Sequence, residues 1–160
     1  MKLLSFPLAA VFAAMLSLTA CGGGGGDSGG GNTTNPAATI KIVAETAGTG
    51  AEAVANSLVQ VRYTGWLYSA TVAGNKGTQF DTNTKAGDPL FQFYVGSGTI
   101  VGFGEAVKGM KQGGKRTVVI PAVLGYGSAG AKDNTGAVVI PGNTDLVFDI
   151  ELVKVCGATC

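Results

Sequence analysis

Alternation of apolar and polar residues dominates the chain from about residue 40 onward. In the stretch SLVQVRYTGWLY (57–68), Val59, Val61 and Tyr63 are separated by polar residues. In LVFDIELVKV (146–155), apolar residues at every second position alternate with Asp149 and Glu151. A period of two is typical of a strand with one buried face. Both stretches are therefore predicted to be strands of a half-buried sheet.

Three shorter stretches extend this pattern: TIKIVAE (39–45), LFQFYV (90–95) and KRTVVI (115–120). Helical spacing is found in one place, about Gly102–Lys111, where Phe103, Val107 and Met110 fall on one face. Many strands and one short helix indicate an α+β domain, in which a mostly antiparallel sheet is packed against the helix.

The N-terminus has a different pattern. A short basic start is followed by an apolar run from Leu8 to Leu16, which is too short to span a bilayer and is typical of a secretory signal. The run ends in LTAC (18–21), which resembles the bacterial lipobox, so Cys21 is predicted to be lipidated and to become the mature N-terminus. The alternative is ordinary signal cleavage after Ala20, with Cys21 incidental.

Residues 22–36, GGGGGDSGGGNTTNP, contain too few apolar side chains to bury a core and are predicted to form a flexible linker. We therefore expect a lipoprotein signal peptide at 1–20, a lipidated cysteine with its Gly-rich linker at 21–37, and a folded domain at 38–160. The expected location is a bacterial membrane facing the periplasm, or another extracytoplasmic surface. Gly22, rather than aspartate, after the cysteine favours the outer membrane.

Composition narrows the possible functions. The length of 160 residues favours one domain, and Lys+Arg 11 against Asp+Glu 10 provides no excess of positive charge for nucleic-acid binding. Histidine is absent, so no histidine-based triad can form. Three cysteines and no histidine cannot supply the four Cys and His ligands of a structural zinc site, and we expect neither metal nor cofactor.

Cys156 and Cys160 form a C-x3-C pair at the end of the chain. Zinc would need more ligands, and a redox dithiol has a different spacing and normally opens a helix. In an exported protein the pair is best interpreted as a small terminal disulfide.

Aromatic residues recur around the predicted strands in the motifs VRYTGWL, GTQFDTN, LFQFYVG, GFGEAVKGMKQGGKRTVVIP, LGYGSAG and IPGNTDLVFDIELV. Together, in collinear order over roughly Ala44 to Val155, they resemble the FKBP-type peptidyl-prolyl cis-trans isomerases. The resemblance implies a bent antiparallel sheet of five to six strands wrapped around one short helix. It also implies that the protein assists folding of exported chains by catalysing rotation about X–Pro bonds.

The resemblance places the active site in an aromatic-lined hollow between the helix and the sheet. It assigns catalytic roles to Tyr63, Asp81, Tyr126 and Phe148. It assigns substrate binding to Phe80, Phe91, Thr99, Ile100, Phe103, Val139 and Ile140. In this interpretation Asp81 orients polar groups and transfers no proton. An alternative is that Asp81 caps the loop near Thr82 and Asn83.

The resemblance also implies partners. They are proline-containing polypeptides and macrolide inhibitors, with a membrane contacted through the lipid anchor and no nucleic acid. We expect a monomer, because the sequence shows no long dimerisation helix before the domain. The alternative function is a peptide-binding or chaperone module that keeps the fold with little catalysis.

Overall fold

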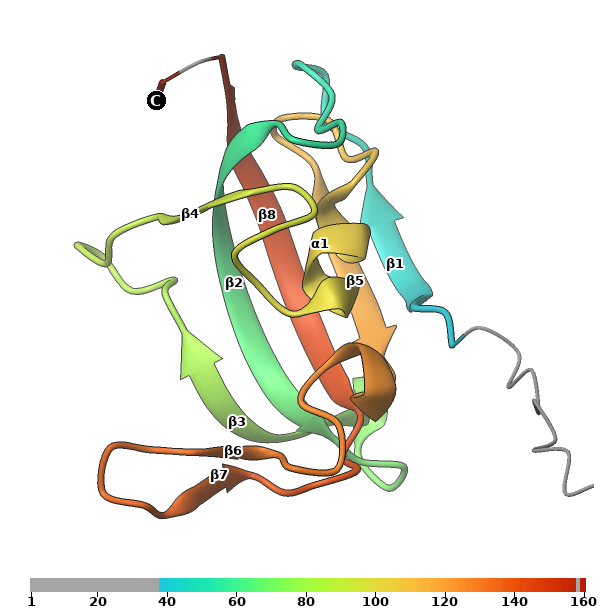
Figure 1. The fold of residues 1–160 in the computed structure, drawn as a ribbon. Coiled ribbons are helices and arrows are strands. Elements are labelled where there is room, and N and C mark those ends of the chain that lie inside the picture. Colours follow the sequence, from blue (N-terminus) through green and yellow to red (C-terminus); the bar gives the residue numbers. More distant parts are fainter. Residues whose placement is uncertain (1–37, 158) are drawn as a thin grey trace, which may run out of the picture. The chain divides into compact units, whose positions relative to one another are not determined.

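The computed structural model describes residues 38–157 and 159–160, so the predicted signal peptide, Cys21 and the Gly-rich linker lie outside the described residues. Within this part of the chain, six strands form an antiparallel sheet (Figure 1): β1 (Lys41–Thr46), β2 (Leu58–Tyr68), β3 (Lys76–Thr82), β4 (Phe91–Tyr94), β5 (Lys115–Ile120) and β8 (Leu146–Cys156). The order across the sheet is β1-β5-β8-β2-β3, and β4 also pairs with β2.

The remaining elements are short. Helix α1 (Val101–Val107) lies across one face of the sheet, and β6 (Ala131–Lys132) pairs with β7 (Val138–Ile140) in a hairpin that extends away from it (Figure 1). Two single-turn 3₁₀ helices are η1 (Ala73–Asn75) and η2 (Ala122–Leu124). The predicted α+β architecture, with its antiparallel sheet and one short helix, is confirmed.

The two long strands with the clearest alternation, β2 and β8, are neighbours in the sheet. They pair from Leu58 opposite Cys156 to Leu67 opposite Leu146. Their inward-facing residues Val59, Val61 and Leu152 are fully buried. The period-two pattern of the sequence therefore predicted strands that the structure places at the core.

The predicted helix was too long at its C-terminal end. Helix α1 ends at Val107 because Lys108 has extended dihedral angles (φ −56°, ψ 132°) and Gly109 has φ 77°. A left-handed glycine at this point is a common helix terminator. Met110 is nevertheless 1% exposed, because the turn after the helix folds it into the same core. Its apolar spacing therefore reflects burial rather than a continuing helix.

The helix lies close to β5. Phe103, Ala106 and Val107 are buried in the core that also contains Ile120 of β5. A Cβ built at Gly102 would collide with Ile120 Cγ2, so the lack of a side chain at Gly102 allows the close approach. The short helix can thereby fill the concave face of the sheet.

Strand β3 departs from regular pairing. Gly65 is opposite Asp81, but Trp66 is opposite Gln79, so Phe80 is an extra residue on the β3 side. In a regular strand, successive side chains point to opposite faces, and a bulge resets this alternation. The bulge at Phe80 allows the consecutive residues Phe80 and Asp81 to face the same side.

The end of β8 is linked to the C-terminus. A disulfide joins Cys156 and Cys160, whose Cα atoms are 5.0 Å apart. Among the residues that the structure describes, no helix is long and apolar enough to cross a membrane.

Candidate active site

The structure brings nine of the eleven predicted site residues around one hollow of about 90 Å³. Its lining consists of Tyr63, Phe80, Asp81, Phe91, Thr99, Ile100, Phe103, Tyr126 and Phe148. Val139 and Ile140 are not part of this lining. Ile140 is 2% exposed and belongs to the core, and Val139 packs partly buried against that core.

Phe103, from α1, lies at the centre of the aromatic cluster with 3% of its surface exposed. Its ring centroid is 5.1 Å from that of Phe148, 5.6 Å from that of Tyr63 and 6.1 Å from that of Phe91, all in edge-to-face geometry. Phe80 packs edge-on against Phe148 at 5.6 Å. Edge-to-face pairs are favoured because the positive edge of one ring meets the negative face of another. The rings thus form rigid apolar walls.

Asp81 holds the hydroxyl of Tyr63. Tyr63 Oη donates a hydrogen bond to Asp81 Oδ2 at 2.5 Å, and Asp81 Oδ1 accepts one from the backbone N–H of Thr82 at 2.8 Å. The carboxylate therefore contacts both the tyrosine hydroxyl and the backbone at the end of β3. Burial, the hydrogen bond to Asp81 and the charge of Asp81 raise the pKa of the Tyr63 phenol.

Tyr126 follows η2 and lines the hollow. It is 38% exposed, so a ligand can reach it. Burial, followed by the charge of Asp81, raises the pKa of the Tyr126 phenol. The hydroxyl therefore stays protonated at neutral pH and can donate a hydrogen bond.

Ile100 precedes the first turn of α1. Its carbonyl oxygen accepts hydrogen bonds from the backbone N–H groups of Phe103 (3.1 Å) and Gly104 (3.3 Å), which fixes the orientation of this residue. Among the backbone hydrogen bonds that turns, loops and caps of the described residues form, none is donated by the N–H of Ile100. Ile100 itself is part of the lining of the hollow.

Two supporting residues were missed by the sequence interpretation. A Cβ at Gly65 would lie 2.6 Å from Phe80 Cζ and 2.8 Å from Phe148 Cε1, so glycine at this position lets both rings pack over the strand. Asn83 Oδ1 accepts a hydrogen bond from Tyr63 N–H at 2.7 Å, while Nδ2 donates to the carbonyls of Val61 and Pro89 at 3.1 Å. Gly65 stands in the YTG motif, but its steric role depends on the bulge in β3, which the sequence does not reveal.

A larger hollow, of about 320 Å³, lies elsewhere on the sheet. Its lining includes Arg62, Thr64, Lys115, Thr117 and Asp149, which are charged or hydroxyl-bearing. It contains no phenylalanine, and Tyr63 lines both hollows. The aromatic surface that suits a proline ring is therefore found in the smaller hollow.

In the described part of the chain, no group of three or more His, Cys, Asp or Glu residues is placed to hold a metal ion.

The chain is similar to known proteins over most of the part that the structure describes. Residues 50–153 match the family described as FKBP-type peptidyl-prolyl cis-trans isomerase. The chain is 40% identical to an FK506-binding protein of Neisseria meningitidis serogroup A over 109 residues, covering 68% of this chain and 88% of that protein. It is 40% identical to FK506-binding protein 1B of Neurospora crassa over 110 residues, covering 69% and 92%. The crystal structure of a peptidyl-prolyl cis-trans isomerase from Pseudomonas syringae pv. tomato is similar, with 35% identity, a TM-score of 0.56 and 74% of each chain covered.

Proposed function

Because the chain belongs to the FKBP-type peptidyl-prolyl cis-trans isomerases, we propose that it catalyses X–Pro rotation in the aromatic hollow between α1 and the sheet. The observation that carries this assignment is the convergence of six aromatic rings on one small cavity: those of Tyr63, Phe80, Phe91, Phe103, Tyr126 and Phe148. A proline ring placed there would contact ring faces and edges in place of water.

Rotation about an X–Pro bond breaks no covalent bond. Its barrier is about 18–20 kcal/mol and arises from the resonance of the planar amide. The twisted amide has lost that resonance and is less polar, so an apolar pocket that removes water disfavours the planar ground state relative to the transition state. Each 1.36 kcal/mol of this preference gives about a tenfold rate increase. Such a mechanism requires no histidine, of which the sequence has none.

Polar groups at the rim would orient the peptide. The N–H of Ile100 would donate to a substrate carbonyl, and the Tyr126 hydroxyl would donate to a neighbouring one. Asp81 would keep the Tyr63 hydroxyl turned toward the carboxylate through their 2.5 Å hydrogen bond. The family resemblance also assigns substrate binding to Val139, which would help to hold the proline ring, and to Ile140, although Ile140 is 2% exposed and packs in the core.

The test is a protease-free isomerisation assay on the purified chain with a short X-Pro peptide, repeated with FK506. We expect catalysis that the macrolide removes at a ratio of one molecule per site, because the relatives named FK506-binding proteins share the family. Uncatalysed rates from a folded sample would leave the peptide-binding or chaperone function. Catalysis that saturating FK506 does not reduce would place the chemistry outside the hollow.

We further propose that the protein is exported and tethered to a bacterial membrane, with the outer membrane favoured, through a lipid on Cys21. This proposal is supported by the apolar run that ends in LTAC and by the glycine-rich segment after it. Expression in a Gram-negative host with labelled palmitate tests it. Label should appear in the native chain and disappear in Cys21→Ser. Equal labelling of both chains, or of neither, contradicts the lipid anchor.

A further inference from the structure

We propose that Lys76 is a positioning residue for isomerisation, acting from the opposite face of the sheet together with the hydroxyl pair of Thr64 and Thr82. Lys76 and the Thr64–Thr82 pair hold the bulged strand β3 so that Phe80 and Asp81 both face the aromatic hollow. This inference rests on the proposed use of that hollow as the active site.

Strand β3 needs such support because of its place in the sheet. It is an edge strand, paired with β2 alone. Its pairing is interrupted twice, between Gly65 and Trp66 and again between Trp66 and Tyr68. Each bulge leaves an extra residue of β3 outside the hydrogen-bond ladder. Backbone pairing alone therefore fixes this strand weakly, although it carries two residues of the site.

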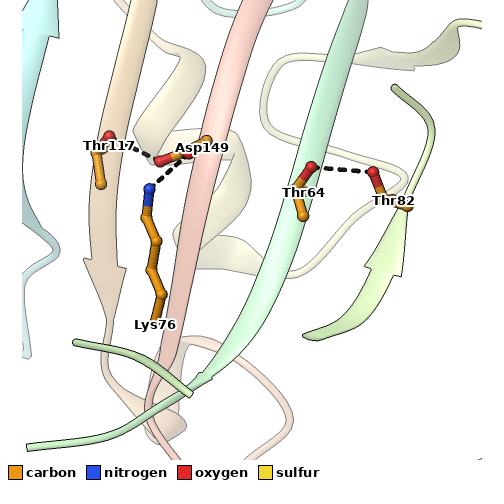
Figure 2. Close-up of polar contacts among 5 residues, drawn as sticks. All are labelled: Thr64, Lys76, Thr82, Thr117 and Asp149. Atoms are coloured by element: carbon orange, nitrogen blue, oxygen red, sulfur yellow. Dashed lines mark hydrogen bonds and ion pairs between the residues drawn. The ribbon is translucent and has the colours of Figure 1, made fainter. Parts of the chain in front are cut away.

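Side chains on the outer face of the sheet tie β3 at both ends (Figure 2). At its C-terminal end, Thr82 Oγ1 lies 2.9 Å from Thr64 Oγ1 of β2 and can donate to the carbonyl of Tyr63 at 3.2 Å. At its N-terminal end, Lys76 Nζ lies 2.6 Å from Asp149 Oδ2 of β8 and 4.7 Å from the centre of the Trp66 ring. The two ties are on either side of the bulge at Phe80.

The anchor for Lys76 is itself held in place. Asp149 Oδ1 accepts a hydrogen bond from Thr117 Oγ1 of β5 at 2.8 Å (Figure 2). Asp149 is also the neighbour of Phe148, against which the Phe80 ring packs at 5.6 Å. The contact between Lys76 and Asp149 thus connects β3 to β8, the strand that carries Phe148. Loss of this contact would let Phe80 move relative to Phe148.

The experiment compares Lys76→Met with Lys115→Met in the full chain. Both substitutions remove one positive charge from the outer face and break one ion pair. Lys115 lies 3.5 Å from Glu151 but is on β5, which β8 and β2 separate from β3 in the sheet. We expect Lys76→Met to lower kcat/KM for an X-Pro peptide by about fivefold, because small displacements of positioned groups have large kinetic effects. Lys115→Met should leave kcat/KM within about twofold of the native value.

Two further variants sharpen the result. Lys76→Arg keeps the charge and can still reach Asp149, so it should recover most of the lost activity. Thr82→Val removes the second tie without changing the shape of the side chain and should lower kcat/KM in the same direction. Equal losses in Lys76→Met and Lys115→Met, or no recovery in Lys76→Arg, would overturn the proposal.

A readout that does not depend on catalysis separates this proposal from the proposed function. NMR spectra of ¹³C-labelled phenylalanine report the ring positions of Phe80 and Phe148 directly. Their resonances should shift in Lys76→Met and Thr82→Val and stay unchanged in Lys115→Met. Unshifted rings in Lys76→Met would refute positioning even if activity fell. If the ring resonances shift in Lys76→Met but the native chain shows no catalysis, positioning would be supported and the proposed function rejected.

Discussion

The two faces of the sheet differ in chemistry although they share the same strands. On the face toward α1, Phe148 of β8 is buried among aromatic rings. On the other face its neighbour Asp149 bonds to Thr117 and Lys76. The concave face offers an apolar surface that can accept a proline ring, whereas the outer face connects strands to one another. The larger hollow is lined mainly by charged and hydroxyl-bearing residues and the smaller one mainly by aromatic residues, so the chemistry of the lining identifies the candidate site better than its size.

Substitution of Phe148 should have the largest effect on stability and catalysis. Its neighbour Val147 is also buried but points to the opposite face of the sheet, so it serves as the control. Phe148→Ala should cost about 3–5 kcal/mol of unfolding free energy and abolish most catalysis, because it removes a wall of the hollow. Val147→Ala, at a residue with 0% exposure, should cost about 2 kcal/mol and keep kcat/KM. Urea unfolding and the isomerisation assay measure both quantities. Equal losses of kcat/KM in Phe148→Ala and Val147→Ala would contradict the claim that only the face toward α1 carries the site.

Gly65→Ala should have the next largest effect. Its added methyl would press on Phe80 and Phe148, and overpacking of this kind costs about 1–3 kcal/mol. The displaced rings should also reduce kcat/KM. Gly157→Ala is the control, because a Cβ there meets no heavy atom within 4 Å. Native activity in Gly65→Ala would show that the hollow tolerates a different ring arrangement.

Tyr126→Phe should have a smaller and purely kinetic effect. Removal of one hydroxyl donor should lower kcat/KM about threefold to tenfold, which corresponds to the net free energy of one hydrogen bond. Unfolding free energy should stay within about 0.5 kcal/mol of the native value. Tyr94→Phe, at a tyrosine that is 51% exposed and outside the hollow, should change neither quantity. A comparable loss of activity in Tyr94→Phe would remove the special role of Tyr126.

The smallest effect concerns pH. The folded chain raises the pKa of Tyr63 above its ordinary value of about 10, so it holds this proton more tightly than the unfolded chain does. The unfolding free energy should therefore fall as pH rises above about 10. Urea unfolding between pH 9 and 11 should show a shallower fall in Tyr63→Phe than in the native chain. Identical slopes would mean that Tyr63 has no raised pKa.

Much of the fold follows from local sequence pattern. Strands β2 and β8 were predicted because both bury one face over many residues, which produces regular alternation. Strand β3 lacks this signal because two bulges break its period. The end of α1 was misplaced because Met110 is buried from a turn, and helical spacing cannot distinguish this from a longer helix.

The residues that line the aromatic hollow were predicted from ordered motifs. The residues that hold them in place, Gly65 and Asn83, were not predicted. Motifs locate residues that form the walls, such as Phe80 and Phe148. They do not reveal that Gly65 must lack a side chain or that Asn83 fixes the backbone of Tyr63. Both roles arise from contacts between strands, and these contacts depend on a register that no local pattern specifies.

The most direct test of the central claim is exchange NMR of an X-Pro peptide with the purified chain. We predict cis–trans exchange that is accelerated by substoichiometric protein and returns to the spontaneous rate with saturating FK506. Peptide binding should shift resonances of the rings around the aromatic hollow and leave those of Thr64, Thr117 and their neighbours on the outer face unchanged. Accelerated exchange accompanied by shifts on the outer face alone would contradict the assignment of the site.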